Sequence, residues 1–103
     1  MRDTLAMNAD VSNTPSVTRH DGRNRYELVI GDEVVAFADF SPGADMITIP
    51  YIETAVRHRG NGYSSVLMDG VIEDLRSRGV RVRATCPVAR AHVAARAPDL
   101  LVR

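Results

Sequence analysis

The stretch RHRGNGYSS, from Arg57 to Ser65, has two glycines spaced by one residue, between a strand-like run and a helix-like run. Glycine adopts positive φ readily and has no side chain, so such a turn exposes several backbone N–H groups to a ligand. The helix that follows adds free N–H groups and the positive end of its dipole. The stretch therefore predicts an anion-binding site, and the phosphates of a cofactor are the expected ligand.

The single cysteine, Cys86, is a second candidate for chemistry. It ends a strand-like run and precedes Pro87, a residue suited to the first position of a helix. Cys86 is therefore expected at or near a helix N-cap, where the dipole favours the thiolate. The other interpretation is a small buried hydrophobic residue, since free cysteine is among the most buried residue types.

Composition excludes several functions. All 13 basic residues are arginine, which excludes mechanisms that need a lysine, such as a Walker-type phosphate loop or a Schiff base. The formal net charge is zero, so no general attraction to nucleic acid is expected. The three histidines are scattered, which predicts no metal site. The sequence has neither a membrane-spanning apolar run nor a signal-peptide hydrophobic region, and it has no cysteine pair for a disulfide, so we expect a cytoplasmic protein.

The elements that position these residues follow from periodicity. Residues 1–16 are polar and aperiodic, and we expect a flexible tail there and a single domain over residues 17–103. Alternating apolar residues predict strands at 17–20, 25–30, 33–40, 46–52 and 80–86. Helical spacing predicts helices at 63–78 and 87–96.

Short turns join the first strands, and a strand, helix, strand succession predicts a right-handed parallel crossover. The predicted fold class is α/β: a mixed sheet with an antiparallel meander of three to four strands, then a βαβ unit and a C-terminal helix. Pro50 lacks the N–H that a central strand needs. We therefore expect Pro50 at a bulge or where the neighbouring strand has separated.

The glycine stretch differs from a dinucleotide fingerprint, because Ser65 stands where the third glycine belongs. It matches Arg-x-x-Gly-x-Gly through Arg57, Gly60 and Gly62, and it resembles the acetyl-CoA-binding motif of the GNAT superfamily of N-acetyltransferases. The resemblance covers roughly residues 26–101 and is strongest to the short stand-alone branch. That branch also has a strand ending in Cys-Pro, as at Cys86-Pro87 here.

Two other pairs extend the match, Glu53-Thr54 before the loop and Pro98-Asp99 after the last helix. The sequence departs from the branch at three positions. Tyr51 stands where a histidine is common, Ile52 where a threonine is common, and His92 where the last helix often has an aromatic residue. These departures affect the transfer of catalytic roles more than the fold.

The resemblance implies acetyl-CoA as the cofactor and an amine as the acceptor. Backbone N–H groups of residues 59–64 would hold the pyrophosphate of coenzyme A. The peptide groups of Ile52 and Thr54 would pair with the pantetheine arm like an added strand, and one N–H would polarise the thioester carbonyl. The implied cofactor-binding residues are Ile52, Thr54, Arg57, Arg59, Gly60, Asn61, Gly62, Tyr63 and Ser64.

The implied catalytic residues are Cys86, His92, Glu53 and Tyr51. Cys86 would face the thioester, either as an acyl-accepting nucleophile or as a hydrogen-bonding group. His92 would donate a proton to the leaving thiolate, or is a surface histidine. Tyr51 and Glu53 would contact the amine or relay its proton through water, although a solvated carboxylate also explains Glu53.

The sequence thus indicates an N-acetyltransferase, either a monomer or a homodimer, that acts on a protein or small-molecule amine. Two alternatives stay open. One is a non-catalytic acyl-CoA-binding or sensing module, because the last helix lacks the tyrosine common in the superfamily. The other is a small protein-interaction domain in which the glycine stretch is only a turn.

Overall fold

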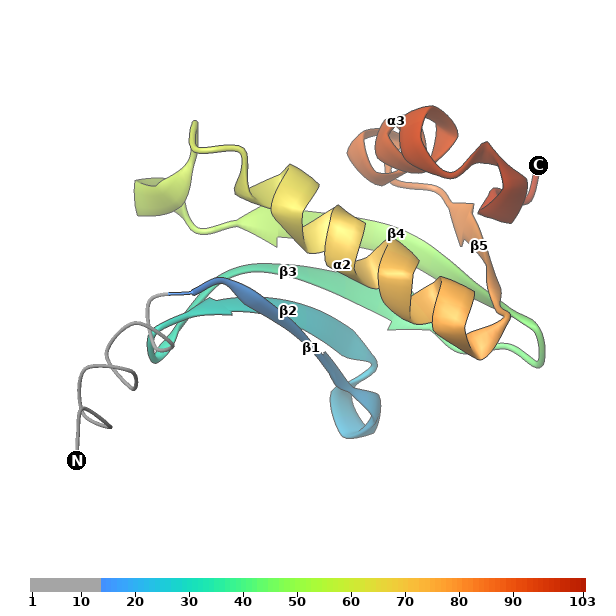
Figure 1. The fold of residues 1–103 in the computed structure, drawn as a ribbon, viewed down its shortest axis with the longest axis horizontal. Helices are drawn as coiled ribbons and strands as arrows, with labels where there is room; N and C mark the ends of the chain where they lie inside the picture. Colours follow the sequence, from blue (N-terminus) through green and yellow to red (C-terminus); the bar gives the residue numbers. More distant parts are fainter. Residues whose placement is uncertain (1–13) are drawn as a thin grey trace.

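The computed structural model describes residues 14–103, which form a five-stranded sheet covered by α-helices on one face (Figure 1). In order across the sheet, the strands are β1 (Ser16–His20), β2 (Arg25–Ile30), β3 (Glu33–Ser41), β4 (Met46–Thr54) and β5 (Arg81–Ala84). The α-helices are α2 (Tyr63–Arg78) and α3 (Pro87–Arg96). The 3₁₀ turns are η1 (Asp21–Arg23), η2 (Val56–His58) and η3 (Pro98–Leu100). No helix in residues 14–103 is both long and apolar enough to cross a bilayer.

The topology confirms the predicted fold class. β1 to β4 pair antiparallel in sequence order, and β5 pairs parallel to β4 after the α2 crossover. The predicted tail, residues 1–16, lies mostly outside the described residues, and Ser16 already belongs to β1. β5 is shorter than expected: it ends at Ala84 because the N–H groups of Thr85 and Cys86 both donate to the carbonyl of Ile49.

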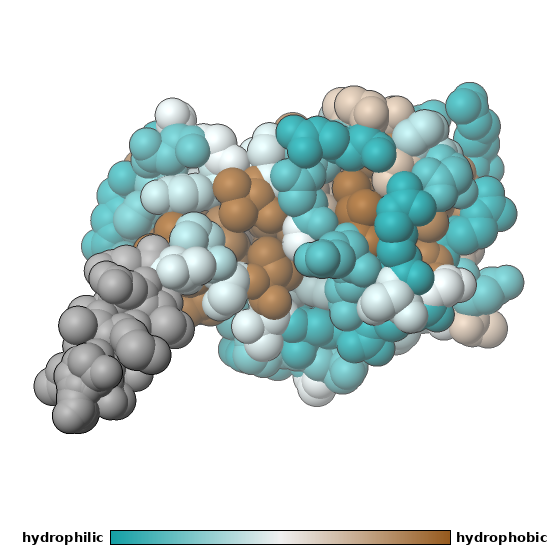
Figure 2. Space-filling model, viewed as in Figure 1, coloured by the Kyte–Doolittle hydropathy of each residue, from teal (hydrophilic) through white to brown (hydrophobic). Residues whose placement is uncertain are grey.

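The core lies between the sheet and the helices. α2 buries the apolar face that its spacing predicts, made of Leu67, Met68, Val71, Ile72 and Leu75. α3 adds Ala89 and Val93. Burying one large aliphatic side chain stabilises a fold by about 1.5–3 kcal/mol, so this face fixes α2 on the sheet. Figure 2 shows apolar patches set among hydrophilic side chains on the side of the molecule that carries α2.

The edge strand β1 lies very close to α2. A Cβ at Gly70 would be 2.4 Å from Cγ2 of Val17, far inside the contact distance of two carbon atoms. A hydrogen-bonded cluster joins the same elements. The Tyr26 hydroxyl donates to Oδ2 of Asp74 at 2.6 Å and accepts from Arg19 at 3.0 Å. Burial, with the hydrogen bond to Asp74, raises the pKa of Tyr26 to about 12.

The register of β4 shifts at Pro50. Asp39 pairs with Tyr51, whereas Ser41 pairs with Thr48, so β4 has one extra residue between these pairs. The predicted bulge at Pro50 is therefore confirmed. β5 pairs with β4 only from Met46 to Ile49. The bulge and the end of the β4–β5 ladder thus coincide, and together they position the site described next.

Candidate functional site

β4 and β5 separate at the carbonyl of Ile49. That oxygen accepts the N–H groups of Thr85 at 3.1 Å and Cys86 at 3.3 Å, and these are the last hydrogen bonds between the two chain segments. Figure 1 shows β5 beside only the first part of β4. Beyond Ile49, the side of β4 that faces away from β3 is therefore open along residues 50–54.

The open side of β4 presents the peptide groups of Ile52 and Thr54. The N–H of Ala55, just after β4, donates to the carbonyl of Val35 in β3 at 2.8 Å. Residues of an antiparallel pair alternate in the direction of their N–H and C=O groups, so those of Ile52 and Thr54 point away from β3. Nε of Arg59 donates to the Thr54 carbonyl at 3.1 Å. The edge therefore offers donors and acceptors to an extended ligand.

The glycine loop and the start of α2 provide the second part of the site. Gly60 has φ 85° and Gly62, the N-cap of α2, has φ 75°. Both conformations favour glycine, as the sequence predicted. Val66 N–H donates to the Gly62 carbonyl at 3.3 Å. The N–H groups of residues 63–65 precede this first helical bond, so they are available to an anion.

These two parts meet at a groove of about 350 Å³. It is lined by Tyr51, Ile52, Glu53, Thr54, His58, Arg59, Gly60, Gly62, Tyr63, Ser64 and Val88. The structure thus brings nine of the predicted site residues together, from Tyr51 to Ser64. The groove runs from backbone donors at the helix start to the open edge of β4.

Arg57 and Asn61 do not line the groove. The Arg57 guanidinium donates to the Glu33 carboxylate at the start of β3. This hydrogen bond, with a second from His58, holds the pKa of Glu33 below its usual value. Nδ2 of Asn61 donates to the His58 carbonyl at 3.0 Å, inside the loop. Arg57 therefore connects the loop to β3, and Asn61 bonds within the loop.

Tyr51 and Glu53 lie together at the rim of the groove. The Tyr51 hydroxyl donates to the Glu53 carboxylate, and this hydrogen bond raises the pKa of Tyr51. Tyr51 and Phe37 make a tilted ring contact, with centroids 6.0 Å apart. Tyr51 is 47% exposed, so the pair is open to solvent.

Cys86 is the N-cap of α3, and Pro87 occupies its first turn, as the sequence predicted. Its backbone N–H lies at the fork between β4 and β5. The side chain is half-buried against the core and does not line the groove of about 350 Å³. The backbone of Cys86 therefore lies where β4 and β5 separate, and its side chain packs against the core.

His92 lies in a different groove, of about 580 Å³, between α2 and α3. Its Nε2 is 3.0 Å from Oδ1 of Asp69, and Arg96 donates to the same oxygen at 2.8 Å. The two grooves share Ser64 and Val88 in their linings, so they adjoin at the start of α2. The structure therefore places His92 beside the site and not with Tyr51 and Glu53.

Two residues that line the first groove, His58 and Val88, were not predicted as site residues. The position of His58 within the glycine stretch was a usable signal. Val88 reaches the groove through packing of α3, which no local pattern indicates. Across residues 14–103, no group of three or more His, Cys, Asp or Glu side chains is arranged to hold a metal ion.

Known structures share this fold. An NMR structure of a GCN5-like putative N-acetyltransferase from Staphylococcus aureus has a TM-score of 0.57 and 18% identity, covering 84% of this chain and 87% of that one. A crystal structure of a putative GNAT acetyltransferase from Desulfovibrio desulfuricans has a TM-score of 0.54 and 20% identity, covering 69% of this chain and 52% of that one. The crystal structure of Ard1 from Thermoplasma volcanium has a TM-score of 0.53 and 23% identity, covering 79% of this chain and 52% of that one. This chain thus spans about half the length of the last two.

No curated protein matches the sequence. The family model described as GCN5-related N-acetyl-transferase matches residues 25–100. The matched region contains β2 to β5, the glycine loop, α2, α3 and the open edge of β4. The sequence match and the shared fold agree, and they support N-acetyltransferase activity in general terms. The chain belongs to the GCN5-related N-acetyltransferase family.

Proposed function

We propose that this protein binds acetyl-CoA in the groove beside β4 and transfers its acetyl group to an amine. One observation carries the proposal: the open edge of β4 and the uncapped start of α2 face the same groove. The first suits an extended amide-containing arm and the second suits phosphate. Coenzyme A has both groups, joined in one molecule.

Each part of the cofactor has matching protein groups. The N–H groups of the loop and of the first turn of α2, residues 59–64, would bind the pyrophosphate. The peptide groups of Ile52 and Thr54 would hydrogen-bond the pantetheine arm, once Arg59 leaves the Thr54 carbonyl. Arg59 then becomes free to approach a phosphate. The adjoining groove between α2 and α3 gives the rest of the cofactor an apolar wall with Arg96 at its margin.

Acetyl-CoA supplies an activated thioester when bound. An acceptor amine must be neutral to attack it, and Glu53 at the rim would accept the ammonium proton directly or through water. Tyr51 would hold the Glu53 carboxylate in place through its hydroxyl. The Ile52 N–H would stabilise the negative charge that develops on the carbonyl oxygen as the C–N bond forms. That charge is lost when the C–S bond breaks, and the proton released from the amide nitrogen neutralises the departing thiolate.

Cys86 would act where β4 and β5 separate. The start of α3 stabilises negative charge there, which favours either an acyl-accepting thiolate or a group that hydrogen-bonds near the thioester sulfur. In this scheme the leaving thiolate takes no proton from His92, since the Nε2 of His92 contacts Asp69 in the adjoining groove. That contact favours the alternative of a non-catalytic acyl-CoA-binding module.

Binding and turnover are tested separately. At a coenzyme A concentration about 100 times Kd, ligand binding should stabilise the native state by about 2.7 kcal/mol, visible as a rise in Tm. No rise would contradict the proposal and favour the protein-interaction domain. Release of free thiol from acetyl-CoA with a panel of peptide and small-molecule amines then measures transfer. Binding without amine-dependent thiol release would indicate the non-catalytic module.

A further inference from the structure

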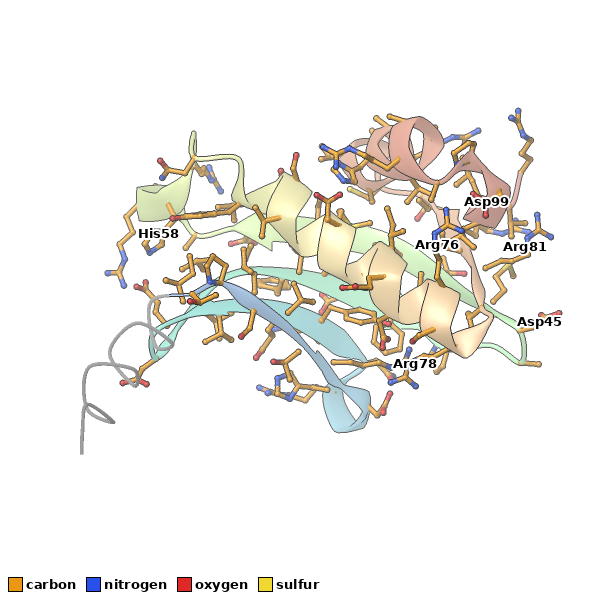
Figure 3. The ribbon with its side chains drawn as sticks, viewed as in Figure 1. Asp45, His58, Arg76, Arg78, Arg81 and Asp99 are labelled. Atoms are coloured by element: carbon orange, nitrogen blue, oxygen red, sulfur yellow. The ribbon has the colours of Figure 1, made fainter. Side chains whose placement is uncertain are left out.

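Glu33 connects the glycine loop to a distant part of the sheet. It is the first residue of β3, directly after the β2–β3 turn. Its carboxylate accepts a hydrogen bond from Arg57, and its Oε2 lies 3.0 Å from Nε2 of His58. Figure 3 shows His58 beside the loop, at the opposite end of the molecule from Arg76 and Asp99. One carboxylate therefore binds two neighbouring residues of the loop.

His58 carries this connection into the phosphate-binding segment. Its carbonyl accepts from Nδ2 of Asn61 at 3.0 Å, between the two glycines. Its ring meets the ring of Tyr63 edge-on, with centroids 6.0 Å apart, at the first residue of α2. Glu33, through His58, is thereby coupled to both residues that flank Gly62.

The loop has few other restraints. A Cβ at Gly60 or Gly62 would meet nothing within 4 Å, so the chain there is not packed against a neighbour. Among residues 14–103, the other hydrogen bonds of residues 56–62 stay inside the loop or reach the adjoining β4 and α2. Glycine loses more conformational freedom than any other residue when it is fixed. An external restraint on this loop therefore lowers the entropy that a ligand must offset.

We propose that Glu33 is a positioning residue, which holds the glycine loop in its phosphate-binding shape by binding Arg57 and His58. The inference rests on the proposed function, because it assigns the loop to the coenzyme A pyrophosphate. Glu33 itself is outside the groove and touches neither the cofactor nor the reacting atoms. Its role is to order the loop before the ligand binds, so that binding loses less conformational entropy.

The test measures coenzyme A binding by calorimetry for wild type, Glu33→Ala, Glu33→Gln and the control Asp32→Ala. Asp32 is the neighbouring exposed carboxylate, so its removal changes the net charge equally. For Glu33→Ala we expect Kd to rise about three- to tenfold, equivalent to about 0.7–1.4 kcal/mol. Glu33→Gln, which keeps an acceptor oxygen for His58, should recover part of the affinity. Asp32→Ala should match wild type.

Kinetics distinguish positioning from other effects. Glu33→Ala should raise KM for acetyl-CoA while kcat at saturating acetyl-CoA stays within about twofold of wild type, because no reacting group has changed. Tm without ligand should stay close to wild type, since exposed ion pairs contribute little to stability.

Unchanged or tighter binding in Glu33→Ala would overturn the inference, since it would mean that the carboxylate only neutralises Arg57. An equal loss in Asp32→Ala would overturn it too, by showing a general charge effect. Failure of the wild-type protein to bind coenzyme A is a separate outcome that removes the proposed function itself.

Discussion

The two halves of β4 use the same backbone chemistry differently. From Met46 to Ile49 the strand pairs with β5, Thr48 also pairs with Ser41 of β3, and Ile47 and Ile49 are buried. From Pro50 to Thr54 it pairs with β3 alone, and its other edge faces the groove. In the first half, backbone N–H and C=O groups bond to β5 along the parallel ladder. The second half leaves part of them for a ligand.

This difference shows how a small domain accommodates a core and a site on one strand. Buried backbone polar groups need partners, so a strand can be left unpaired only where water or a ligand reaches it. Pro50 marks that boundary, since it has no N–H to leave without a partner. The substitutions below test whether the two halves of β4 differ in what they contribute to stability and to ligand binding.

The largest expected effect is on stability, from Ile49→Ala. Ile49 is fully buried, and truncating such a residue removes apolar contacts and leaves a cavity. We expect a loss of about 2–5 kcal/mol in the free energy of unfolding, measured by urea denaturation. Ile52→Ala, in the half-buried second half, should cost clearly less stability but weaken coenzyme A binding. Equal stability losses would contradict the proposed division of β4.

Glu53→Gln tests the open half for chemistry. We expect kcat to fall about a hundredfold, with KM for acetyl-CoA little changed, because a general base has been removed while the fold is kept. Asp39→Asn is the control, since Asp39 pairs across the sheet with Tyr51 and bonds Arg25. Thiol-release kinetics measure both variants. Full activity in Glu53→Gln would exclude the carboxylate from proton transfer.

The two glycine caps of α2 provide a matched comparison of its ends. Gly62 at the start has φ 75° and Gly79 after the end has φ 67°, and a Cβ at either would meet nothing within 4 Å. Alanine at either position should lower the free energy of unfolding by a similar amount, roughly 1–2 kcal/mol, because a residue with a Cβ is strained in the left-handed conformation. Only Gly62→Ala should also weaken coenzyme A binding, by about tenfold, since Gly62 lines the groove and Gly79 does not. Similar binding in both variants would remove the loop from the cofactor site.

The smallest expected effect is on the titration of Tyr51. The Glu53 carboxylate, by hydrogen bond, raises the pKa of Tyr51, because the phenolate would lose that bond and face a negative charge. In Glu53→Gln, Tyr51 should therefore ionise at lower pH than in wild type. Ultraviolet difference titration measures this, with Tyr51→Phe to assign the signal. An unchanged titration would show that the pair does not persist in solution.

Local sequence signals predicted most of the fold. The strand predicted at 25–30, the helix predicted at 63–78 and the helix predicted to begin at Pro87 all have these bounds in the structure. The backbone part of the site was predictable for a related reason. The open edge of β4 and the glycine loop are consecutive in sequence. Predicting the strand, the turn and the helix correctly is therefore enough to bring them to one groove.

Contacts between distant elements were not predictable in the same way. Glu33 reaches His58 over 25 residues, and His92 reaches Asp69 over 23. Such pairs depend on the register of strands and on which helix faces meet, and neither follows from a single sequence pattern. The resemblance implied a place for His92 beside the leaving thiolate, with a surface histidine as the other interpretation, and His92 lines the adjoining groove.

The close approach at Gly70 has a consequence for how this chain meets other chains. Val17 fills the space that a side chain at position 70 would need, so Gly70→Ala would push β1 away from α2 and weaken its place on the sheet. β1 in turn covers the edge of β2. An uncovered strand edge is a template for pairing with another polypeptide. A single added methyl group in the middle of a helix would therefore promote aggregation through a strand that the helix does not contain.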